Sequence, residues 1–140
     1  MTIIATARTT STAPPAAFFA RWADVATWPE WNTDIEWVRS SGPFAEGSTG
    51  TLKPKGGPKV EFVIERLTDS EFVDVSKLFG ARLTFAHEVG VTAGRTVVTV
   101  RVSIDGPLRS LWKKILGADL ARSVQPDLDA LVSVVEGMKA

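Results

Sequence analysis

Hydrophobic and polar residues alternate over much of the 140-residue chain. A period of two is typical of strands that have one buried face and one exposed face. Short runs rich in glycine, proline and polar residues separate the alternating segments, and strands joined by such short connections pair as antiparallel neighbours. The pattern therefore predicts an antiparallel meander. Its seven strands are expected at residues 3–10, 35–40, 48–53, 59–67, 71–78, 82–89 and 95–104.

Two short helices are predicted between the first and the second strand. Phe18 and Trp22 stand one helical turn apart and mark the apolar side of the first helix. The segment "VATW" at residues 25–28 predicts the second helix, and Pro29 is expected to end it, because proline disfavours helical geometry at the residue before it.

The C-terminal segment, from residue 107 to residue 138, has apolar residues at helical spacing. Two stripes can be drawn: one consists of Leu108, Leu111, Trp112 and Ile115, and the other runs from Leu120 to Met138. The two stripes do not align on one continuous helix, so we expect a break at Gly117, which lies between them. This helix is the only predicted element long enough to cover the apolar face of the sheet.

Composition and charge describe an ordinary folded protein. Hydrophobic residues make up 44% and charged residues 23% of the chain, close to the averages for globular proteins, and the length fits one domain over residues 1–140. Sixteen Lys and Arg balance sixteen Asp and Glu, so no net charge favours nucleic acid. The sequence has no secretory signal and no apolar run that could span a membrane. We expect a cytoplasmic monomer or homodimer without stable membrane insertion.

Metal and thiol chemistry are not expected. Cysteine is absent and histidine occurs once, whereas a zinc site needs three or four ligands of this kind. The sequence therefore predicts no metal site and no cofactor.

Tryptophans are concentrated in one part of the chain. Four of the five lie in the sixteen residues from Trp22 to Trp37. We expect Trp28 and Trp31 to pack against one end of the sheet, where each ring buries a large apolar area. Trp37, at the start of a strand, and Trp112, on the C-terminal helix, are better candidates for the wall of a pocket.

His87 is the candidate for chemistry. The alternation places it on the same face of its strand as Leu83, Phe85 and Val89. Burial there would lower its pKa, and it could act as a general acid or base or bind a polar group of a ligand. The alternative is a structural histidine held by a backbone or carboxylate partner. The pattern leaves open which of five charged strand residues face inward: Arg39, Glu65, Asp74, Lys77 and Arg101.

Four segments carry a resemblance to a known family: "ADVATWPEWN", "LKPKGGP", "LTFAHEV" and "GPLRSLWKKILG". Together with the order of elements, they resemble the START-like superfamily, also called SRPBCC, and within it the polyketide cyclase/dehydrase-like branch. The resemblance covers nearly the whole chain. It implies an α+β helix-grip fold, in which a curved seven-stranded antiparallel sheet wraps around the long C-terminal helix and leaves a cavity.

Three functions stay open, because this fold serves several of them. The first is binding or carrying a small hydrophobic molecule, such as a lipid or a polyketide-like compound, in the cavity. The second is a polyketide cyclase or dehydratase that uses His87 as its acid or base, and the third is a non-catalytic interaction or regulatory module. The resemblance implies that the cavity opens between the last helix and the tips of hairpins, which here are the turns at residues 54–58 and 79–81. Its expected lining residues are Trp37, Phe62, Phe85, His87, Trp112, Ile115 and Val124.

Overall fold

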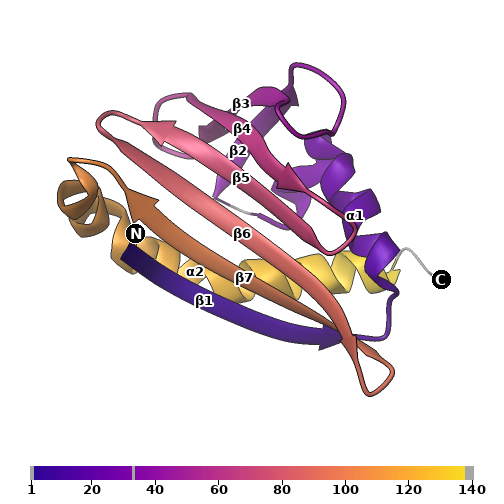
Figure 1. The fold of residues 1–140 in the computed structure, drawn as a ribbon. Coiled ribbons are helices and arrows are strands. Elements are labelled where there is room, and N and C mark those ends of the chain that lie inside the picture. Colours follow the sequence, from indigo (N-terminus) through magenta and orange to yellow (C-terminus); the bar gives the residue numbers. More distant parts are fainter. Residues whose placement is uncertain (1, 33, 138–140) are drawn as a thin grey trace.

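The computed structural model describes residues 2–32 and 34–137, and its elements follow the predicted order (Figure 1). Seven strands form one antiparallel sheet in the order β1-β7-β6-β5-β4-β3-β2. The predicted meander is confirmed, and the main difference is that the sixth strand is longer than expected. The strands are β1 (Thr2–Ser11), β2 (Ile35–Ser40), β3 (Thr49–Pro54), β4 (Val60–Leu67), β5 (Glu71–Leu78), β6 (Ala81–Thr92) and β7 (Arg95–Asp105).

Two short helices, α1 (Pro15–Ala23) and η1 (Val25–Glu30), connect β1 to β2 as predicted. The second is a 3-10 helix, and it continues through Pro29 instead of ending before it. The backbone N–H of Trp31 donates to the carbonyl of Trp28 across the proline. The missing N–H of the proline therefore interrupts no hydrogen bond of this turn.

The C-terminal helix α2 (Arg109–Gly137) is continuous, so the predicted break at Gly117 is wrong. The prediction placed Leu111 and Ile115 on the inner stripe, but they are 51% and 55% exposed. The true inner stripe includes Leu116 and passes Gly117 without interruption, although the helix axis bends after its first turns (Figure 1). Met138 lies outside the described residues. The inner residues include Trp112, Leu116, Leu120, Val124, Leu128, Leu131 and Val135.

The sheet curls around α2, and the core lies between them (Figure 1). The helix packs mainly against β1 and β7, at one edge of the sheet. On the other side of the helix, rings from α1 and η1 reach the middle strands: Trp22 contacts Phe72 of β5, and Trp28 contacts Phe62 of β4. The two short helices therefore fill part of the space that α2 does not cover.

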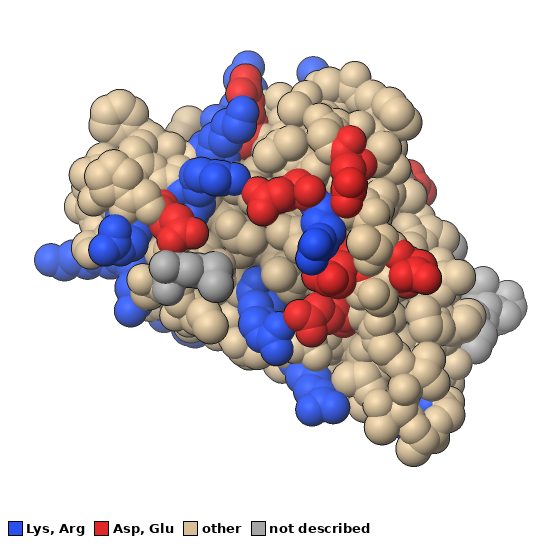
Figure 2. All heavy atoms as spheres, in the orientation of Figure 1, with Lys and Arg blue, Asp and Glu red and all other residues tan. Residues whose placement is uncertain are grey.

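The outer face of the sheet is charged and carries both signs. Lys and Arg side chains alternate there with Asp and Glu side chains (Figure 2). Ion pairs cross between strands on this face, with 2.9 Å between Arg82 and Glu65 and 2.7 Å between Arg101 and Glu88. Exposed pairs of this kind contribute at most about 1 kcal/mol each. Their importance here is that they assign Glu65 and Arg101 to the outer face.

Candidate ligand-binding site

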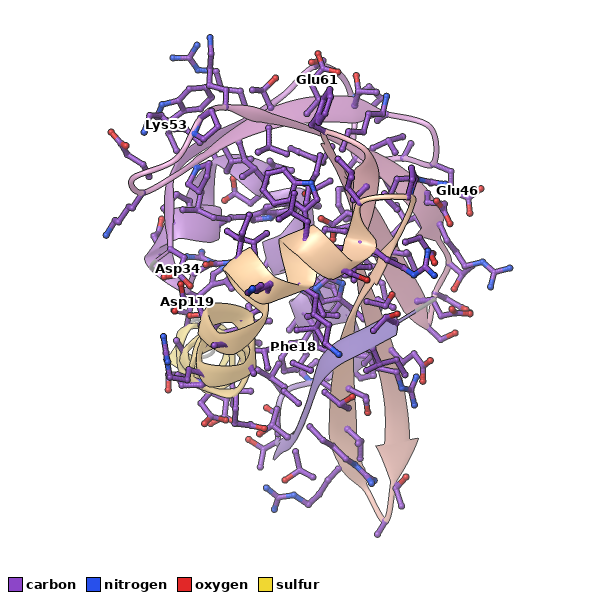
Figure 3. The ribbon with its side chains drawn as sticks, turned by 90° about the vertical axis from the view of Figure 1, so that its left-hand side faces the viewer. Phe18, Asp34, Glu46, Lys53, Glu61 and Asp119 are labelled. Carbon is purple, nitrogen blue, oxygen red and sulfur yellow. The ribbon has the colours of Figure 1, made fainter. Side chains whose placement is uncertain are left out.

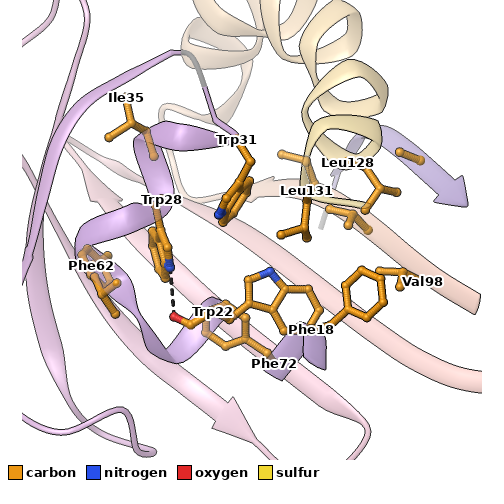
Figure 4. Close-up of a cluster of buried hydrophobic side chains, with 14 of the residues drawn as sticks. Phe18, Trp22, Trp28, Trp31, Ile35, Phe62, Phe72, Val98, Leu128 and Leu131 are labelled. Atoms are coloured by element: carbon orange, nitrogen blue, oxygen red, sulfur yellow. Dashed lines mark hydrogen bonds between the residues drawn. The ribbon is translucent and has the colours of Figure 1, made fainter. Parts of the chain in front are cut away.

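A pocket of about 670 Å³ lies between the sheet, the two short helices and α2. Two of its tryptophans, Trp22 and Trp31, lie beside the α2 residues Leu128 and Leu131 (Figure 4). They are there because α1 and η1 direct their apolar sides into the space beside α2. The aromatic residues that line the pocket are Trp22, Trp28, Trp31, Phe72, Phe85 and Trp112.

The indole N–H groups of Trp22 in α1, Trp28 in η1 and Trp31 directly after η1 differ in their hydrogen bonding. The N–H of Trp28 donates to the carbonyl of Trp22 at 2.9 Å (Figure 4). The N–H groups of Trp22 and Trp31 are buried without a hydrogen-bond partner among the described residues. A buried donor left unpaired costs about 1–3 kcal/mol. Both N–H groups are enclosed by surrounding protein atoms, so they belong to the packing of the rings and lie out of reach of a ligand in this conformation.

Strand β5 contributes the polar part of the pocket. Phe72, Asp74, Ser76 and Leu78 occupy alternate positions of this strand, and all four line the pocket. Asp74 and Ser76 are 5% and 4% exposed, and His87 of the neighbouring strand is 8% exposed. Three polar side chains are thus buried together among aromatic and aliphatic lining residues.

His87 is held in one orientation by its surroundings. Its Nδ1 lies 2.8 Å from the carbonyl oxygen of Phe72 and must donate to it, because a carbonyl only accepts. The imidazole stacks on the Phe72 ring at 4.8 Å and lies 5.0 Å from the ring of Trp22. This bond selects the neutral tautomer with the proton on Nδ1, so Nε2 is the acceptor of the ring.

Asp74 and His87 influence the same part of the pocket, since Asp74 Oδ1 lies 4.0 Å from His87 Nδ1. Burial raises the pKa of Asp74 from 3.8 to about 7, and a hydrogen bond from its own backbone opposes the change. Burial lowers the pKa of His87 from 6.5 to about 4, as the sequence predicted, and the bond to Phe72 opposes this change. Both side chains are therefore mainly uncharged between about pH 4 and pH 7.

The mouth of the pocket is formed by exposed lining residues on three segments. Asp34 lies before β2, Lys55 lies in the β3–β4 turn, and Asp119 and Arg122 lie on α2. Asp34 and Asp119 lie on the same side of the molecule (Figure 3). The backbone N–H of Lys55 donates to the carbonyl of Asp34 at 2.9 Å, and the Arg122 guanidinium pairs with the Asp119 carboxylate. The predicted turn at residues 54–58 therefore belongs to the mouth.

The second turn expected at the mouth, residues 79–81, does not line the pocket. The indole N–H of Trp112 donates to the carbonyl of Phe79 at 2.7 Å. This bond fastens the β5–β6 turn to the first turn of α2. Trp112 lines the pocket at this end, and the turn at residues 79–81 is not part of the mouth as expected.

Four of the seven predicted lining residues lie in the wall of the pocket: Phe85, His87, Trp112 and Val124. Trp37 does not, because a register shift between Ile35 and Trp37 turns it to the outer face, where the Arg39 guanidinium lies 4.6 Å from its ring centroid. Phe62 is buried behind Trp28 instead of facing the pocket. Ile115 is on the exposed side of α2.

Of the five charged residues that the sequence left unassigned, Asp74 lines the pocket. The other four do not: Glu65 and Arg101 form the outer ion pairs, Arg39 covers Trp37, and Lys77 is exposed. The sequence also did not assign Trp22, Trp28 and Trp31 to the pocket. The only sequence feature that pointed to them was their concentration in one short segment. That feature does not distinguish tryptophans that pack in the core from tryptophans that line a pocket.

The described part of the chain contains no group of three or more His, Cys, Asp and Glu side chains that could hold a metal ion. Within the same residues, no helix is both long enough and apolar enough to cross a membrane.

A curved seven-stranded sheet around a long C-terminal helix, with a short helix after the first strand, defines the class of START-like proteins with the helix-grip fold. The chain belongs to the family described as polyketide cyclase / dehydrase and lipid transport, which its residues 2–136 match. No curated protein matches the sequence. The resemblance expected from the sequence is therefore confirmed at the level of the family.

Solved structures of similar fold include TTHA0849 from Thermus thermophilus, at 14% identity and a TM-score of 0.76, covering 97% of this chain and 99% of that one. A START superfamily protein from Mycobacterium smegmatis has 14% identity and a TM-score of 0.70, with coverages of 95% and 97%. The di-domain ARO/CYC StfQ from the steffimycin biosynthetic pathway has 11% identity and a TM-score of 0.76, covering 99% of this chain and 52% of that one. Identities this low establish the fold alone.

Proposed function

We propose that this protein binds a small, mainly apolar molecule in the pocket between α2 and the sheet. The observation that carries the proposal is a pocket of about 670 Å³ whose aromatic wall surrounds three buried polar side chains, Asp74, Ser76 and His87. Small-molecule sites have volumes of roughly 300–1,000 Å³, apolar walls and a few well-placed polar groups. Of the predicted residues, Phe85, His87, Trp112 and Val124 are the proposed ligand contacts.

A neutral fluorescent probe, N-phenyl-1-naphthylamine, tests the proposal. We expect saturable binding of one probe per chain, with increased probe fluorescence. Val124 lines the pocket from α2, so Val124→Trp should fill part of the pocket and weaken probe binding about tenfold or more, since a ring there removes volume that the ligand needs. Ala121→Trp is the matched control on the exposed side of the same helix and should leave affinity unchanged. Equal affinity in all three proteins would contradict a site in this pocket.

Acid/base catalysis is the second candidate, and the pair formed by Asp74 and His87 supports it. A general acid or base works best when its pKa is near the working pH. The pKa of Asp74, about 7, meets this condition better than that of His87, about 4. We therefore propose Asp74 as the proton-transferring group of such a reaction, with His87 as its neutral neighbour. The third candidate is an interaction module, for which a core without a cavity is expected. The pocket therefore favours the first two candidates.

Exchange of the methyl protons of 2-acetylnaphthalene for deuterium, followed by NMR, tests acid/base catalysis without knowledge of a natural substrate. The exchange requires removal of a proton next to a carbonyl group. Asp74→Asn should lower a protein-catalysed rate by about 10²–10⁴, the usual contribution of one acid/base group. If the native protein binds the ketone and does not accelerate exchange, binding without catalysis is supported.

A further inference from the structure

We propose that Asp74 makes the pocket selective for the charge of its ligand: the pocket accepts a neutral molecule whose inner end carries a hydroxyl group and rejects the carboxylate of the same skeleton. The inference rests on the proposed function and narrows it to a chemical class. Apolar acids, including fatty acids, would then be excluded as ligands, while apolar alcohols of similar size would bind.

The charges around the pocket are the first support. Four carboxylate side chains contribute to its lining, against two cations. One of the cations, Arg122, is paired with one of the carboxylates, Asp119, at the mouth. The other, Lys55, is an exposed residue of the β3–β4 turn. A ligand carboxylate seated beside Asp74 would therefore find no buried cation among the described lining residues, and ionised Asp74 would repel it. The four acidic residues are Asp34, Asp74, Asp119 and Asp127.

The hydrogen-bonding groups of the pocket are the second support, and they are independent of the first. Ser76 lines the pocket with a hydroxyl group that can donate or accept a hydrogen bond, and Asp74 can donate one while it is protonated. His87 uses Nδ1 to donate to Phe72, so its Nε2 can only accept. A carboxylate only accepts, and an ammonium group only donates. A hydroxyl group does both, which is why the inference favours a neutral hydroxylated ligand over an amine.

The protonation of Asp74 gives the selectivity a pH dependence. Burial brings the pKa of its carboxyl group to about 7, so the ionised form becomes dominant as the pH rises through neutrality. The charged and titratable groups that line the pocket with it are His87 on β6, Asp119, Arg122 and Asp127 on α2, Lys55 in the β3–β4 turn and Asp34 before β2. Of these, His87 is closest, with 4.0 Å between its Nδ1 and the Asp74 carboxylate, and it is neutral near pH 7. Binding of an anion should therefore weaken as Asp74 ionises.

Four naphthalene derivatives of nearly equal size test the inference: 2-methylnaphthalene, 2-naphthalenemethanol, 2-naphthoate and 2-naphthylmethylamine. Their affinities are measured by titration calorimetry or by quenching of tryptophan fluorescence, at pH 6 and pH 8. We expect the alcohol to bind most tightly at both values. The carboxylate should bind about tenfold or more weakly than the alcohol at pH 8, and this ratio should shrink at pH 6, because repulsion between two buried charges a few ångströms apart is strong.

Asp74→Asn keeps the size and the polarity of the side chain but cannot ionise. In this variant the affinity of the carboxylate should become nearly independent of pH, and the ratio of alcohol to carboxylate affinity at pH 8 should fall to about the native value at pH 6. Asp69→Asn removes one negative charge from the exposed β4–β5 turn and is the matched control. It should behave like the native protein. The measurements on the native protein alone still test the inference if the Asp74 variant does not fold.

The possible results separate the inference from the proposed function. Binding of the hydrocarbon together with equal binding of alcohol and carboxylate at pH 8 would overturn the charge selectivity and leave the pocket as a binding site. Tighter binding of the amine than of the alcohol would also overturn the inference, because it would make Asp74 a counter-ion. Failure of all four compounds to bind would overturn both the selectivity and the proposed function.

Discussion

The pair formed by Asp74 and His87 makes a prediction about stability that does not depend on any ligand. Both groups are buried. Burial raises the pKa of Asp74 to about 7 and lowers the pKa of His87 to about 4. Replacing one of them at a time should expose two opposite effects of pH on folding. The variants are His87→Gln, Asp74→Asn and the double variant, which serves as the common reference because every other titratable group is retained.

The sign of each effect follows from which state holds more protons. Folded Asp74 keeps its proton up to about pH 7, whereas the unfolded chain loses it near 3.8. The stability that Asp74 contributes is therefore fully present below about pH 4 and is lost as the pH rises to about 7. At about 1.4 kcal/mol for each pH unit, the loss amounts to about 4 kcal/mol.

His87 behaves in the opposite way. The unfolded chain binds its proton near pH 6.5, and the folded protein binds it only near 4. Its contribution to stability is complete above about pH 6.5 and is lost as the pH falls through 4, by about 3 kcal/mol. In the native protein the two effects oppose each other between about pH 4 and pH 6.5, and little net dependence should remain from this pair.

Urea unfolding between pH 4 and pH 8 measures these contributions. Relative to the double variant, His87→Gln should lose about 4 kcal/mol of stability as the pH rises, Asp74→Asn should gain about 3 kcal/mol, and the native protein should stay nearly level up to pH 6.5. Because His87 is the only histidine, its NMR titration gives its charge directly and should have a midpoint near pH 4. A midpoint above 6.5 would refute the reasoning, since it would make the two residues an ion pair instead of a neutral pair.

Two further predictions concern contacts away from the polar pair. Trp112→Phe removes the N–H that donates to the Phe79 carbonyl at 2.7 Å and should cost about 1 kcal/mol of unfolding free energy, while Trp37→Phe on the outer face should cost less. Gly50→Ala would place a Cβ 2.4 Å from the Phe62 ring and 2.6 Å from the Arg39 carbonyl, so it should cost about 1–3 kcal/mol; Gly90→Ala, which meets nothing within 4 Å, is its control. Equal effects in either pair of variants would contradict these contacts.

The fold was predictable because its signals are local. Alternation identified all seven strands, and helical spacing identified α1, η1 and α2. The break predicted at Gly117 failed because both Leu111 and Leu116 fit an apolar stripe, and only the position of the sheet decides which of them is buried. Because α2 packs on β1 and β7, it leaves a space open beside it, and the pocket lies in this space. The pocket could not be predicted from local sequence patterns, because it exists only once the elements have assembled.

The site was predictable only in part. His87 was found because the alternation of β6 is clean, with Leu83 and Val89 on the same buried face. Asp74 was left open because the apolar residues Phe72 and Val73 point to opposite faces of β5, so the residue types show no simple alternation. Trp37 was misassigned because the register shift between Ile35 and Trp37 cannot be read from residue types.

The positions of the polar groups suggest a division of roles within the site. Asp74, Ser76 and His87 stand on β5 and β6, which pair with each other along the whole of β5, from Glu71 to Leu78. Side chains on paired central strands keep fixed positions, and such positions suit recognition of a polar group. The mouth, in contrast, includes the β3–β4 turn, where Gly56 has a φ of 75°, a conformation that glycine adopts without strain. A ligand would then be admitted past a turn and recognised on a rigid sheet. Variants of the turn should therefore change rates of binding and release together, while variants of Asp74 should change which ligands bind.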